Sequence, residues 1–405
     1  MKRFVIVGAS SRGLGMFVRG LEDRRGRELE FVGVYDPNRT RCEVFKKEIG
    51  DSLTIYSDFD TMLESEKPDG VIVTTTDNYH AKYVIRALEA GCEVYCEKPL
   101  TNTYENCLAI RQAEKRTGKS VKVTFNMRFM PYFAKLKELI RDGAIGTVKA
   151  VNFEYILNRW HGGDYFKRWH GIMDISQGML LHKSTHHFDA INWLLEDEPS
   201  KVNAMGLKSF YGNPDRCFAF RCSQCERYKE CESYKSQSAH LDQELYFNAE
   251  HEDGYIRDRC AHRPETDIYD NMSVSVLYKG GALLTYSLNL FGMKEGFNLT
   301  IIGEEGMMFG RYFHNELDAR DTYEIELMQK ENTVKKIIFP KAEGVHGGGD
   351  VRLLDMMFGA PVPDPLGQAA DSFAGVMSAM IGIGANESIK TGKTYDVAAA
   401  LETLR

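Results

Sequence analysis

The chain has 405 residues, of which 43% are hydrophobic and 27% are charged, and 51 basic against 58 acidic residues leave a net charge of −7. This composition is typical of a globular enzyme and excludes disordered, collagen-like and coiled-coil chains. The mild negative charge gives no long-range attraction to nucleic acid or an anionic membrane, and no stretch approaches the ~20 apolar residues of a membrane span.

The length exceeds the size at which one hydrophobic core keeps growing, so we expect two domains, residues 1–126 and 127–405. The first 13 residues contain too short an apolar run for a secretory signal and reach Gly, Ser and Arg too early. We therefore expect a cytoplasmic protein that binds neither nucleic acid nor a membrane.

Apolar runs of strand length alternate with helical patterns through the first third of the chain. Continuous Val and Ile runs between helices are typical of parallel strands buried on both faces. The alternation predicts an α/β domain of the Rossmann type. The predicted strands are Phe4–Val7, Phe31–Tyr35, Leu53–Tyr56, Val71–Thr74, Glu93–Tyr95 and Val121–Thr124.

The first predicted strand leads into a glycine-containing turn and a helix. Gly8 allows the tight bend, and Gly13 lets the helix pack closely on the strand, while Ser10 stands where a second glycine usually admits a pyrophosphate. Two glycines in such a turn are weak alone, and a Rossmann-like domain without a cofactor is the alternative. The turn residues expected to hold a dinucleotide are Gly8, Ser10, Ser11, Arg12 and Gly13.

Asp36 ends the second predicted strand, 23 residues beyond Gly13. A carboxylate at this position can accept both hydroxyls of the adenosine ribose, and it repels a 2′-phosphate. The position therefore favours NAD over NADP. Arg39 could stack on adenine or neutralise a phosphate, so NADP stays open.

Two more predicted strands end in polar segments at the same carboxyl edge, where such sheets bind ligands. A strand end that faces a cofactor is a poor place for a solvated charge, which makes Lys98 a candidate for the site. An exposed loop lysine paired with Glu97 is the alternative. After the fourth strand, the residues expected to contact the cofactor are Thr75, Asn78 and His80.

Together these motifs resemble the Gfo/Idh/MocA family of NAD(P)-dependent enzymes that act on sugars and cyclitols. The resemblance implies that Lys98 lies beside the nicotinamide and the substrate hydroxyl as a catalytic residue, with Glu97 and Pro99 holding it. It also implies a cis bond before Pro99. The residues that carry it are the Val-Gly-x-Ser-x-x-Gly turn, Asp36-Pro37, Thr75 to His80 and Glu97-Lys98-Pro99-Leu100.

The rest of the chain predicts an α+β domain with a large, open and mostly antiparallel sheet. Gly-rich turns between alternating apolar runs indicate an antiparallel meander. The resemblance implies a homodimer or homotetramer formed through the face of this sheet, and the last helices could return to pack on the first domain. The main predicted strands are Thr147–Leu157, Ser273–Tyr278, Leu283–Leu290, Phe297–Ile302 and Gly306–Phe309.

Asn126 and Arg128 follow the sixth predicted strand at the ligand edge of the first sheet. We expect Asn126 to contact the cofactor. For Arg128 a substrate contact and a buried structural ion pair are equally open.

The densest histidine region, residues 178–193, is predicted as one helix. At 100° per residue, His182, His186, Asp189 and Trp193 form one stripe, opposite an apolar stripe that buries the helix. A single histidine in a helix is usually structural, but two imidazoles and a carboxylate on one face favour a site.

The resemblance implies an Asp-x-x-x-His motif here, in which His186 is the base that accepts the substrate's hydroxyl proton. His182 replaces the aspartate that orients this base in relatives. Asp189, Lys183 or Lys98 would then reshape the proton path. A metal shared by the two histidines is less favoured, because the sequence offers no third ligand.

Aromatic and polar residues before this helix fit a carbohydrate pocket, because sugars stack C–H faces on aromatic rings and need hydrogen-bond partners for their hydroxyls. Trp160 and Trp169 each precede a histidine and are expected to bind substrate, unless they form a rim or an oligomer contact. His346 lies in a Gly-rich loop with Asp350, and we expect it to reach the pocket; helix entry is the alternative.

The cysteine count is unusual, because five of nine cysteines fall within residues 217–260. A C-x2-C pair and two further thiols in a polar segment, residues 210–263, fit a structural zinc that would stabilise it. Cys217 and His262 compete as ligands, an iron–sulfur cluster uses the same ligands, and free thiols are the alternative. The expected zinc ligands are Cys222, Cys225, Cys231 and Cys260.

These observations predict an oxidoreductase that transfers hydride between a secondary hydroxyl of a sugar, glycoside or cyclitol and a nicotinamide cofactor. A redox-neutral glycosidase that oxidises, eliminates and re-reduces its substrate on retained NAD is the alternative. A non-catalytic protein that binds NAD is disfavoured, because Lys98 and His186 are both present.

Overall fold

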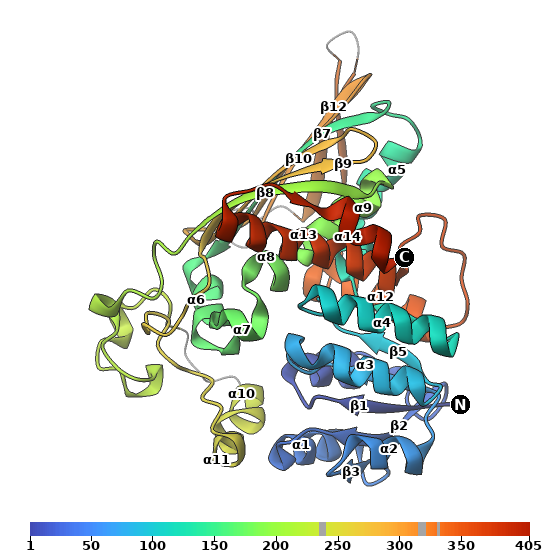
Figure 1. The fold of residues 1–405 in the computed structure, drawn as a ribbon, viewed down its shortest axis with the longest axis vertical. Helices are drawn as coiled ribbons and strands as arrows, with labels where there is room; N and C mark the ends of the chain where they lie inside the picture. Colours follow the sequence, from blue (N-terminus) through green and yellow to red (C-terminus); the bar gives the residue numbers. More distant parts are fainter. Residues whose placement is uncertain (235–239, 315–320, 330–332) are drawn as a thin grey trace.

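The computed structural model describes residues 1–234, 240–314, 321–329 and 333–405. It has two sheets, a mainly parallel one near the N-terminus and a larger mixed one, with helices packed between them (Figure 1). The predicted fold class, a Rossmann domain followed by an α+β domain with a large open sheet, is confirmed. In the part of the chain that the structure describes, no helix is both long and apolar enough to cross a membrane.

The first sheet contains all six predicted parallel strands, in the order β6-β5-β4-β1-β2-β3. Its central strand β4 is buried along its whole length, as expected for a strand covered on both faces. The strands are β1 (Lys2–Val7), β2 (Leu29–Tyr35), β3 (Thr54–Tyr56), β4 (Gly70–Val73), β5 (Glu93–Cys96) and β6 (Val121–Val123). The covering helices are η1 (Gly13–Arg19), α1 (Arg39–Ile49), α2 (Phe59–Glu66), α3 (His80–Glu89) and α4 (Tyr104–Thr117).

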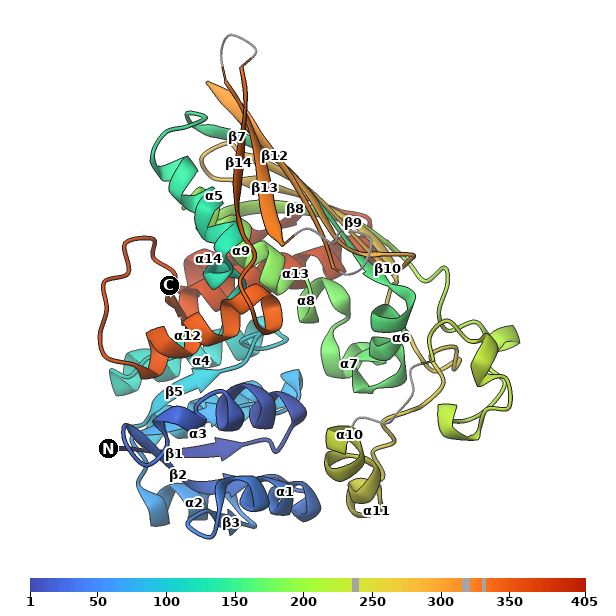
Figure 2. The same ribbon diagram turned by 180° about the vertical axis from the view of Figure 1, so that it is seen from behind.

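The C-terminal part of the chain returns to the first sheet. β15 (Ala370–Asp371) pairs antiparallel with β6 and extends the sheet by one strand. α12 (Gly349–Phe358) packs against one face of the first sheet, where Phe358 stacks on Tyr95 of β5 with ring centroids 4.6 Å apart. α13 (Ser372–Thr391) and α14 (Val397–Leu404) lie between the two sheets (Figure 2).

The second sheet has the order β14-β13-β12-β11-β7-β10-β9-β8-β16. The predicted meander is wrong in one respect, because β7 enters between β10 and β11 and runs parallel to β10. Alternating burial in β9 puts one face of the sheet on the helices and leaves the other open. The strands are β7 (Val148–Asn158), β8 (Pro199–Leu207), β9 (Asn271–Tyr278), β10 (Leu283–Gly292), β11 (Glu295–Gly303), β12 (Gly306–His314), β13 (Thr322–Gln329), β14 (Val334–Pro340) and β16 (Tyr395–Asp396).

The histidine-rich segment is two helices rather than the predicted single one. The backbone N–H groups of Lys183 and Ser184 both donate to the carbonyl oxygen of Met179, and the Ser184 hydroxyl donates to it as well. These bonds interrupt the regular helical ladder between the two helices. The helices that lie between the sheets are α5 (Pro131–Arg141), α6 (Arg159–Lys167), α7 (Met173–Ser176), α8 (Met179–His182) and α9 (Thr185–Leu195).

The polar segment between β8 and β9 forms short helices, including α10 (His240–Leu245) and α11 (Glu250–Asp253), which lie beside α1 in both views (Figures 1 and 2). We call residues 210–263 the insertion. Arg221 ties it together through Glu250 and Asp258, whose carboxylates accept from its guanidinium. Ion pairs and hydrogen bonds, with few buried apolar side chains, hold this part of the chain.

Candidate functional site

A cavity of about 490 Å³ lies along the carboxyl edge of the first sheet and reaches α6, α8 and α9. Most of the predicted site residues line it: Gly8, Ser10, Ser11, Arg12, Asp36, Thr75, Asn78, His80, Glu97, Lys98, Trp169, His182, Lys183, His186 and His346. The predicted residues outside its lining are Gly13, Arg39, Asn126, Arg128, Trp160 and Asp189. The cavity thus joins the glycine turn to the histidine helices, although these segments are far apart in sequence.

The glycine turn packs directly on the end of β4. A Cβ at Gly8, which has a φ of +94°, would lie 2.6 Å from the backbone of Thr74, and one at Gly13 would lie 2.7 Å from the Thr74 hydroxyl. The hydroxyl donates to the Gly8 carbonyl oxygen at 2.7 Å. Only glycine fits either position, which brings the start of η1 close to the sheet edge.

Asp36 lies at the end of the cavity that is formed by β2. Its carboxylate accepts the backbone N–H groups of Ala9 at 2.9 Å and Asn38 at 2.8 Å, and burial raises its pKa. Each oxygen keeps a lone pair for a ribose hydroxyl, and the glycine turn and the helix start lie next to it. This donor and acceptor set fits the adenosine and pyrophosphate of a dinucleotide.

The structure does not support the predicted cofactor contact of Arg39. Its side chain is exposed, pairs with Glu43 at 3.1 Å and lies outside the cavity lining. Arg41 lies two residues further along α1, on the face toward Asp36, and lines the cavity instead. The side-chain direction at a helix start could not be fixed from sequence.

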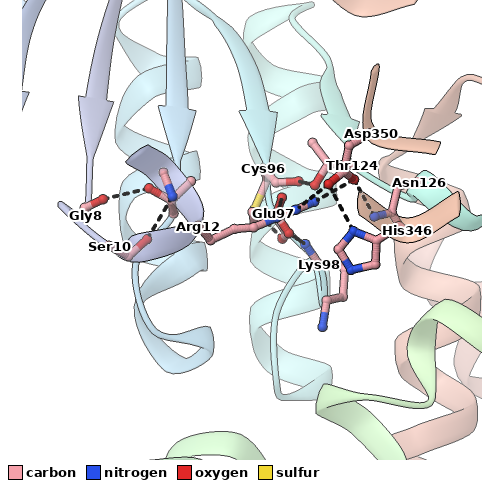
Figure 3. Close-up of polar contacts among 12 residues, drawn as sticks. Gly8, Ser10, Arg12, Cys96, Glu97, Lys98, Thr124, Asn126, His346 and Asp350 are labelled. Atoms are coloured by element: carbon pink, nitrogen blue, oxygen red, sulfur yellow. Dashed lines mark hydrogen bonds and ion pairs between the residues drawn. The ribbon is translucent and has the colours of Figure 1, made fainter. Parts of the chain in front are cut away.

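Arg12 and Asp350 connect the glycine turn to the Glu-Lys-Pro segment and α12 (Figure 3). Arg12 donates from Nε to Glu97 at 2.8 Å and from Nη1 to Asp350 at 2.9 Å. Asp350 also accepts from Asn126 at 2.6 Å and contacts His346 Nδ1 at 2.9 Å. Although burial opposes it, these hydrogen bonds hold the pKa of Asp350 well below its usual value.

This network involves two residues predicted to contact the cofactor, Asn126 and Arg12. Asn126 is buried and holds Asp350, so it supports the site from behind the cavity. The charge of Arg12 is neutralised by two carboxylates, although the residue still lines the cavity. Both residues fix the loop that carries Lys98.

Lys98 follows β5, and its peptide bond to Pro99 is cis, as the resemblance implied. Its Nζ donates to the backbone carbonyl of His182 at 2.9 Å. Burial lowers the pKa of Lys98 to about 8, against the attraction of the Asp77 carboxylate. An ammonium held in a buried cavity at this pKa suits stabilisation of an oxyanion.

Asp77 supplies the carboxylate that the histidine helix lacks. Its Oδ2 lies 2.6 Å from His182 Nδ1, so a residue of the first domain orients a histidine of the second. Burial raises the pKa of Asp77 and lowers that of His182, each far from its usual value. Asp77 is not among the site residues predicted from sequence, although a carboxylate shortly after β4 at the ligand edge was the available signal.

We expect Asp77→Asn to lower kcat by about 10²-fold, because the amide cannot hold His182 in the same protonation state. The KM for substrate and the Kd for NAD should change little. Steady-state kinetics over a range of pH checks this, and the pH profile of kcat should change shape. Asp60→Asn, which breaks an exposed pair with Arg86, is the control. A lower Tm with an unchanged pH profile would leave Asp77 a purely structural role.

His186 and Lys183 face the same cavity from the start of α9 and the break before it. His186 Nδ1 is buried, and in the part of the chain that the structure describes it has no hydrogen-bond partner. Burial and the charge of Lys98 lower the pKa of His186 well below its ordinary value. A neutral imidazole with an unsatisfied nitrogen can accept a proton from a ligand.

Arg128 and Asp189 form a buried bidentate ion pair, with bonds of 2.8 and 2.6 Å, and neither lines the cavity. A substrate contact of Arg128 and a place for Asp189 in the proton path are therefore not supported, and the alternative left open for Arg128, a buried structural ion pair, is the one observed. The break between α8 and α9 is the reason, because it removes Asp189 from the stripe of His182.

His80 holds two loops of the cavity together. Its Nδ1 lies 2.8 Å from the Pro99 carbonyl and its Nε2 lies 3.1 Å from that of Thr75. Burial lowers its pKa. The residue thus fixes the Lys98-Pro99 segment relative to the polar end of β4.

An aromatic wall closes the cavity opposite the first sheet. Tyr165 and Trp169 line it together with His161 and His170, and the rings of Trp169 and His170 stack with centroids 3.6 Å apart. Trp160 lies outside the lining, and its neighbour His161 takes the place predicted for it. The direction of side chains in α6 decides which of the two faces the cavity.

The cysteine cluster does not support the predicted zinc site. Cys222, Cys225, Cys231 and Cys260 surround a separate cavity of about 160 Å³, but within the described residues no three His, Cys, Asp or Glu side chains converge closely enough to hold a metal. All four are free thiols. Cys222 Sγ donates instead to the Arg259 carbonyl oxygen at 3.8 Å.

Two family models match nearly the whole chain. The model described as the oxidoreductase family with an NAD-binding Rossmann fold, Gfo/Idh/MocA, matches residues 2–125, and the model of the family's C-terminal α/β domain matches residues 137–397. The chain belongs to this family. The predicted resemblance is confirmed, and with it the assignment to the nicotinamide-dependent dehydrogenases at the level of the family.

Individual relatives agree with this assignment. The YteT protein of Bacillus subtilis (strain 168) is 34% identical over 425 residues, covering 97% of each chain. Inositol 2-dehydrogenase 3 of Saccharopolyspora erythraea is 32% identical over 170 residues, covering 42% of this chain and 47% of the relative. A solved levoglucosan dehydrogenase in complex with NADH and levoglucosan has the same fold, with a TM-score of 0.71 at 17% identity over 98% of this chain and 99% of that one.

Proposed function

We propose that this protein is an NAD-dependent dehydrogenase that oxidises a secondary hydroxyl of a sugar, glycoside or cyclitol. One observation carries the proposal: Lys98, His182 and His186 line the same cavity as the glycine turn and Asp36. Bound NAD supplies the hydride acceptor. The residues of this chain would bind the hydroxyl, remove its proton and stabilise the charge that develops on its oxygen.

Each role follows from the surroundings of the residue. His186 is neutral and lines the cavity, so it would accept the hydroxyl proton on its imidazole ring. Lys98 would stabilise the alkoxide through its ammonium group. His182, whose ring is oriented by Asp77, would relay a proton between the cavity and this carboxylate of the first domain.

The aromatic wall supports the class of substrate. Trp169 and Tyr165 offer flat apolar surfaces, and Lys183 and Arg168 bring hydrogen-bond donors to the same wall. Stacking surfaces beside several donors are typical of a site for a ring that bears hydroxyl groups.

The test is the appearance of NADH, by absorbance, when the purified protein is mixed with NAD⁺ and a panel of polyols, sugars and glycosides. We expect stoichiometric oxidation of at least one cyclic polyol or glycoside. Acyclic or non-hydroxylated compounds are the controls. Binding of NAD with no turnover across the whole panel would contradict the proposal.

A redox-neutral reaction on retained NAD is the second candidate. It is favoured by Tyr246 and Tyr255 of the insertion, which line the cavity beside the glycine turn and narrow the path for cofactor release. The same panel separates the two, because product without free NADH would indicate an enzyme that oxidises and re-reduces its substrate.

Two expectations stay proposals. Exposed apolar side chains on the open face of the second sheet, among them Met205, Leu207 and Leu283, support the homodimer or homotetramer implied by the family. Light scattering of the purified protein tests the oligomer, and cell fractionation tests the cytoplasmic location.

A further inference from the structure

The insertion docks on the first domain at the N-terminus of α1. The carboxylate of Glu252 in α11 accepts the backbone N–H of Arg39 at 2.6 Å and that of Thr40 at 2.8 Å, and it also accepts the Thr40 hydroxyl. Asn38 Nδ2 donates to the Ala249 carbonyl at 2.8 Å beside this contact. A carboxylate from the other domain thus caps α1.

This helix start is the place where NAD and NADP differ. α1 begins three residues after Asp36, the carboxylate at the ribose end of the cavity. A 2′-phosphate on that ribose would need cations or N–H groups here, because free N–H groups at a helix start and nearby arginines are what bind it. Any group that already holds these donors competes with the phosphate.

In the described structure, carboxylates already pair with the donors at this corner. Arg39 pairs with Glu43 at 3.1 Å, and Arg41 pairs with Asp253 at 2.8 Å. The Asn38 backbone N–H donates to Asp36. With Glu252 on the two N–H groups of α1, four carboxylates lie against the donors of this corner.

The insertion also forms part of the cavity wall. Tyr246 accepts the backbone N–H of Ser11 through its hydroxyl at 3.0 Å, and Arg41 lies between the rings of Tyr246 and Tyr255, 5.5 and 5.6 Å from their centroids. These contacts place α11, and with it Glu252, beside the cofactor end of the cavity, although Glu252 itself does not line it. Its carboxylate is positioned there by the Arg39 and Thr40 N–H groups.

We propose that Glu252 is a specificity-determining residue that excludes the 2′-phosphate of NADP and so reserves the cavity for NAD. The inference rests on the proposed function, because it assumes that a nicotinamide dinucleotide binds in this cavity. The insertion, as well as Asp36, would then select NAD over NADP. The selection works by charge repulsion and by occupation of the donors that a phosphate would need.

The test is binding of NAD⁺ and NADP⁺, by calorimetry, to the full-length protein and to Glu252→Gln. The amide keeps one acceptor for the α1 cap but loses the charge. Because a 2′-phosphate carries nearly two negative charges, we expect NADP⁺ to bind about tenfold more tightly to the variant. NAD⁺ should bind as it does to the wild type.

Glu244→Gln is the matched control. It breaks another pair between the insertion and α1, with Lys47 at 2.9 Å, away from the helix start. The control should bind both dinucleotides like the wild type, and a second variant, Glu252→Ala, should favour NADP⁺ at least as much as Glu252→Gln if charge is the cause.

Three outcomes would overturn the inference alone: an unchanged ratio of NAD⁺ to NADP⁺ affinity, an equal loss of both, or the same gain of NADP⁺ binding in the control. A wild-type protein that binds neither dinucleotide would overturn the proposed function, and the inference with it.

Discussion

Replacing Lys98 with alanine is expected to lower kcat/KM by about 10³-fold, the scale observed when a group that stabilises a developing oxyanion is removed. The ammonium is buried in the cavity and held by the carbonyl of His182. The Kd for NAD should change little, because the glycine turn and Asp36 are untouched. Steady-state kinetics and calorimetry on the same preparation check both parts.

The charge of Lys98 gives the prediction a pH dependence. With a pKa of about 8, the ammonium loses its proton as pH rises through 8, so kcat/KM should fall above that pH. The Lys98→Arg variant keeps its charge over this range. Whatever activity remains in it, its kcat/KM should not decrease above pH 8. A rise of wild-type activity through the same range would indicate that neutral Lys98 acts as a base.

Stability provides the control for folding. Burial lowers the pKa of Lys98 in the folded protein, so the folded state binds fewer protons than the unfolded chain above pH 8 and the free energy of unfolding rises with pH there. At neutral pH the buried ammonium of Lys98 therefore lowers the free energy of unfolding. Lys98→Met should therefore not lower Tm, and a large decrease would contradict this account of the site.

The strands of the first domain could be predicted because each is a continuous apolar run between helices. The same logic located the glycine turn, Asp36 and Lys98, since parallel strands bring their carboxyl ends to one edge. In this domain the apolar runs of the sequence correspond one to one with the strands of the parallel sheet. Several residues that line the cavity from this domain were therefore accessible from sequence order, whereas Asp77 and Arg41 were not.

The second domain was predicted less completely, because its contacts are long-range. No local signal places β7 between strands that follow it by more than 100 residues. The break before Ser184 depends on hydrogen bonds to one carbonyl, and it separates His182 from Asp189. A periodicity argument assumes an unbroken helix and cannot detect such a break.

Contacts between domains account for the remaining errors. Asp77 orients His182 across 105 positions of sequence, and Asp350 meets Arg12 across 338. A pairing at this separation leaves no trace in the spacing of either residue. For the same reason, the insertion was interpreted through its cysteines, whereas Tyr246 and Glu252 make its contacts with the first domain.

The two domains contribute different chemical groups to the site. The first domain brings a carboxylate and a lysine to the sheet edge, and the second brings two histidines with lowered pKa values. In the proposed reaction His186 of the second domain accepts the proton and Lys98 of the first stabilises the alkoxide, so both sets are needed. Activity should therefore depend on the packing of the two domains, which Arg12 and Asp350 hold together at the cavity.

Replacing His186 with alanine is expected to lower kcat/KM by about 10³-fold, because it removes the group proposed to accept the substrate proton. The Kd for NAD should stay within about twofold, since the glycine turn and Asp36 are untouched. Single-turnover kinetics, which separate hydride transfer from product release, check that the chemical step is the one that slows.

His187→Gln is the matched control for His186→Ala. The neighbouring histidine is buried, contacts the Tyr286 hydroxyl at 2.6 Å and lies outside the cavity lining, so its loss should lower Tm and spare the chemical step. Loss of turnover in His182→Ala with near-normal turnover in His186→Ala would contradict the assignment, and it would make the histidine that Asp77 orients the base.

The pH dependence of stability gives an independent readout. Burial lowers the pKa of His186, so below the ordinary histidine pKa of about 6.5 the unfolded chain binds a proton that the folded protein does not. The free energy of unfolding should therefore fall as pH drops below that value. His186→Ala removes one such group, and its stability should decline less steeply with acid than that of the wild type.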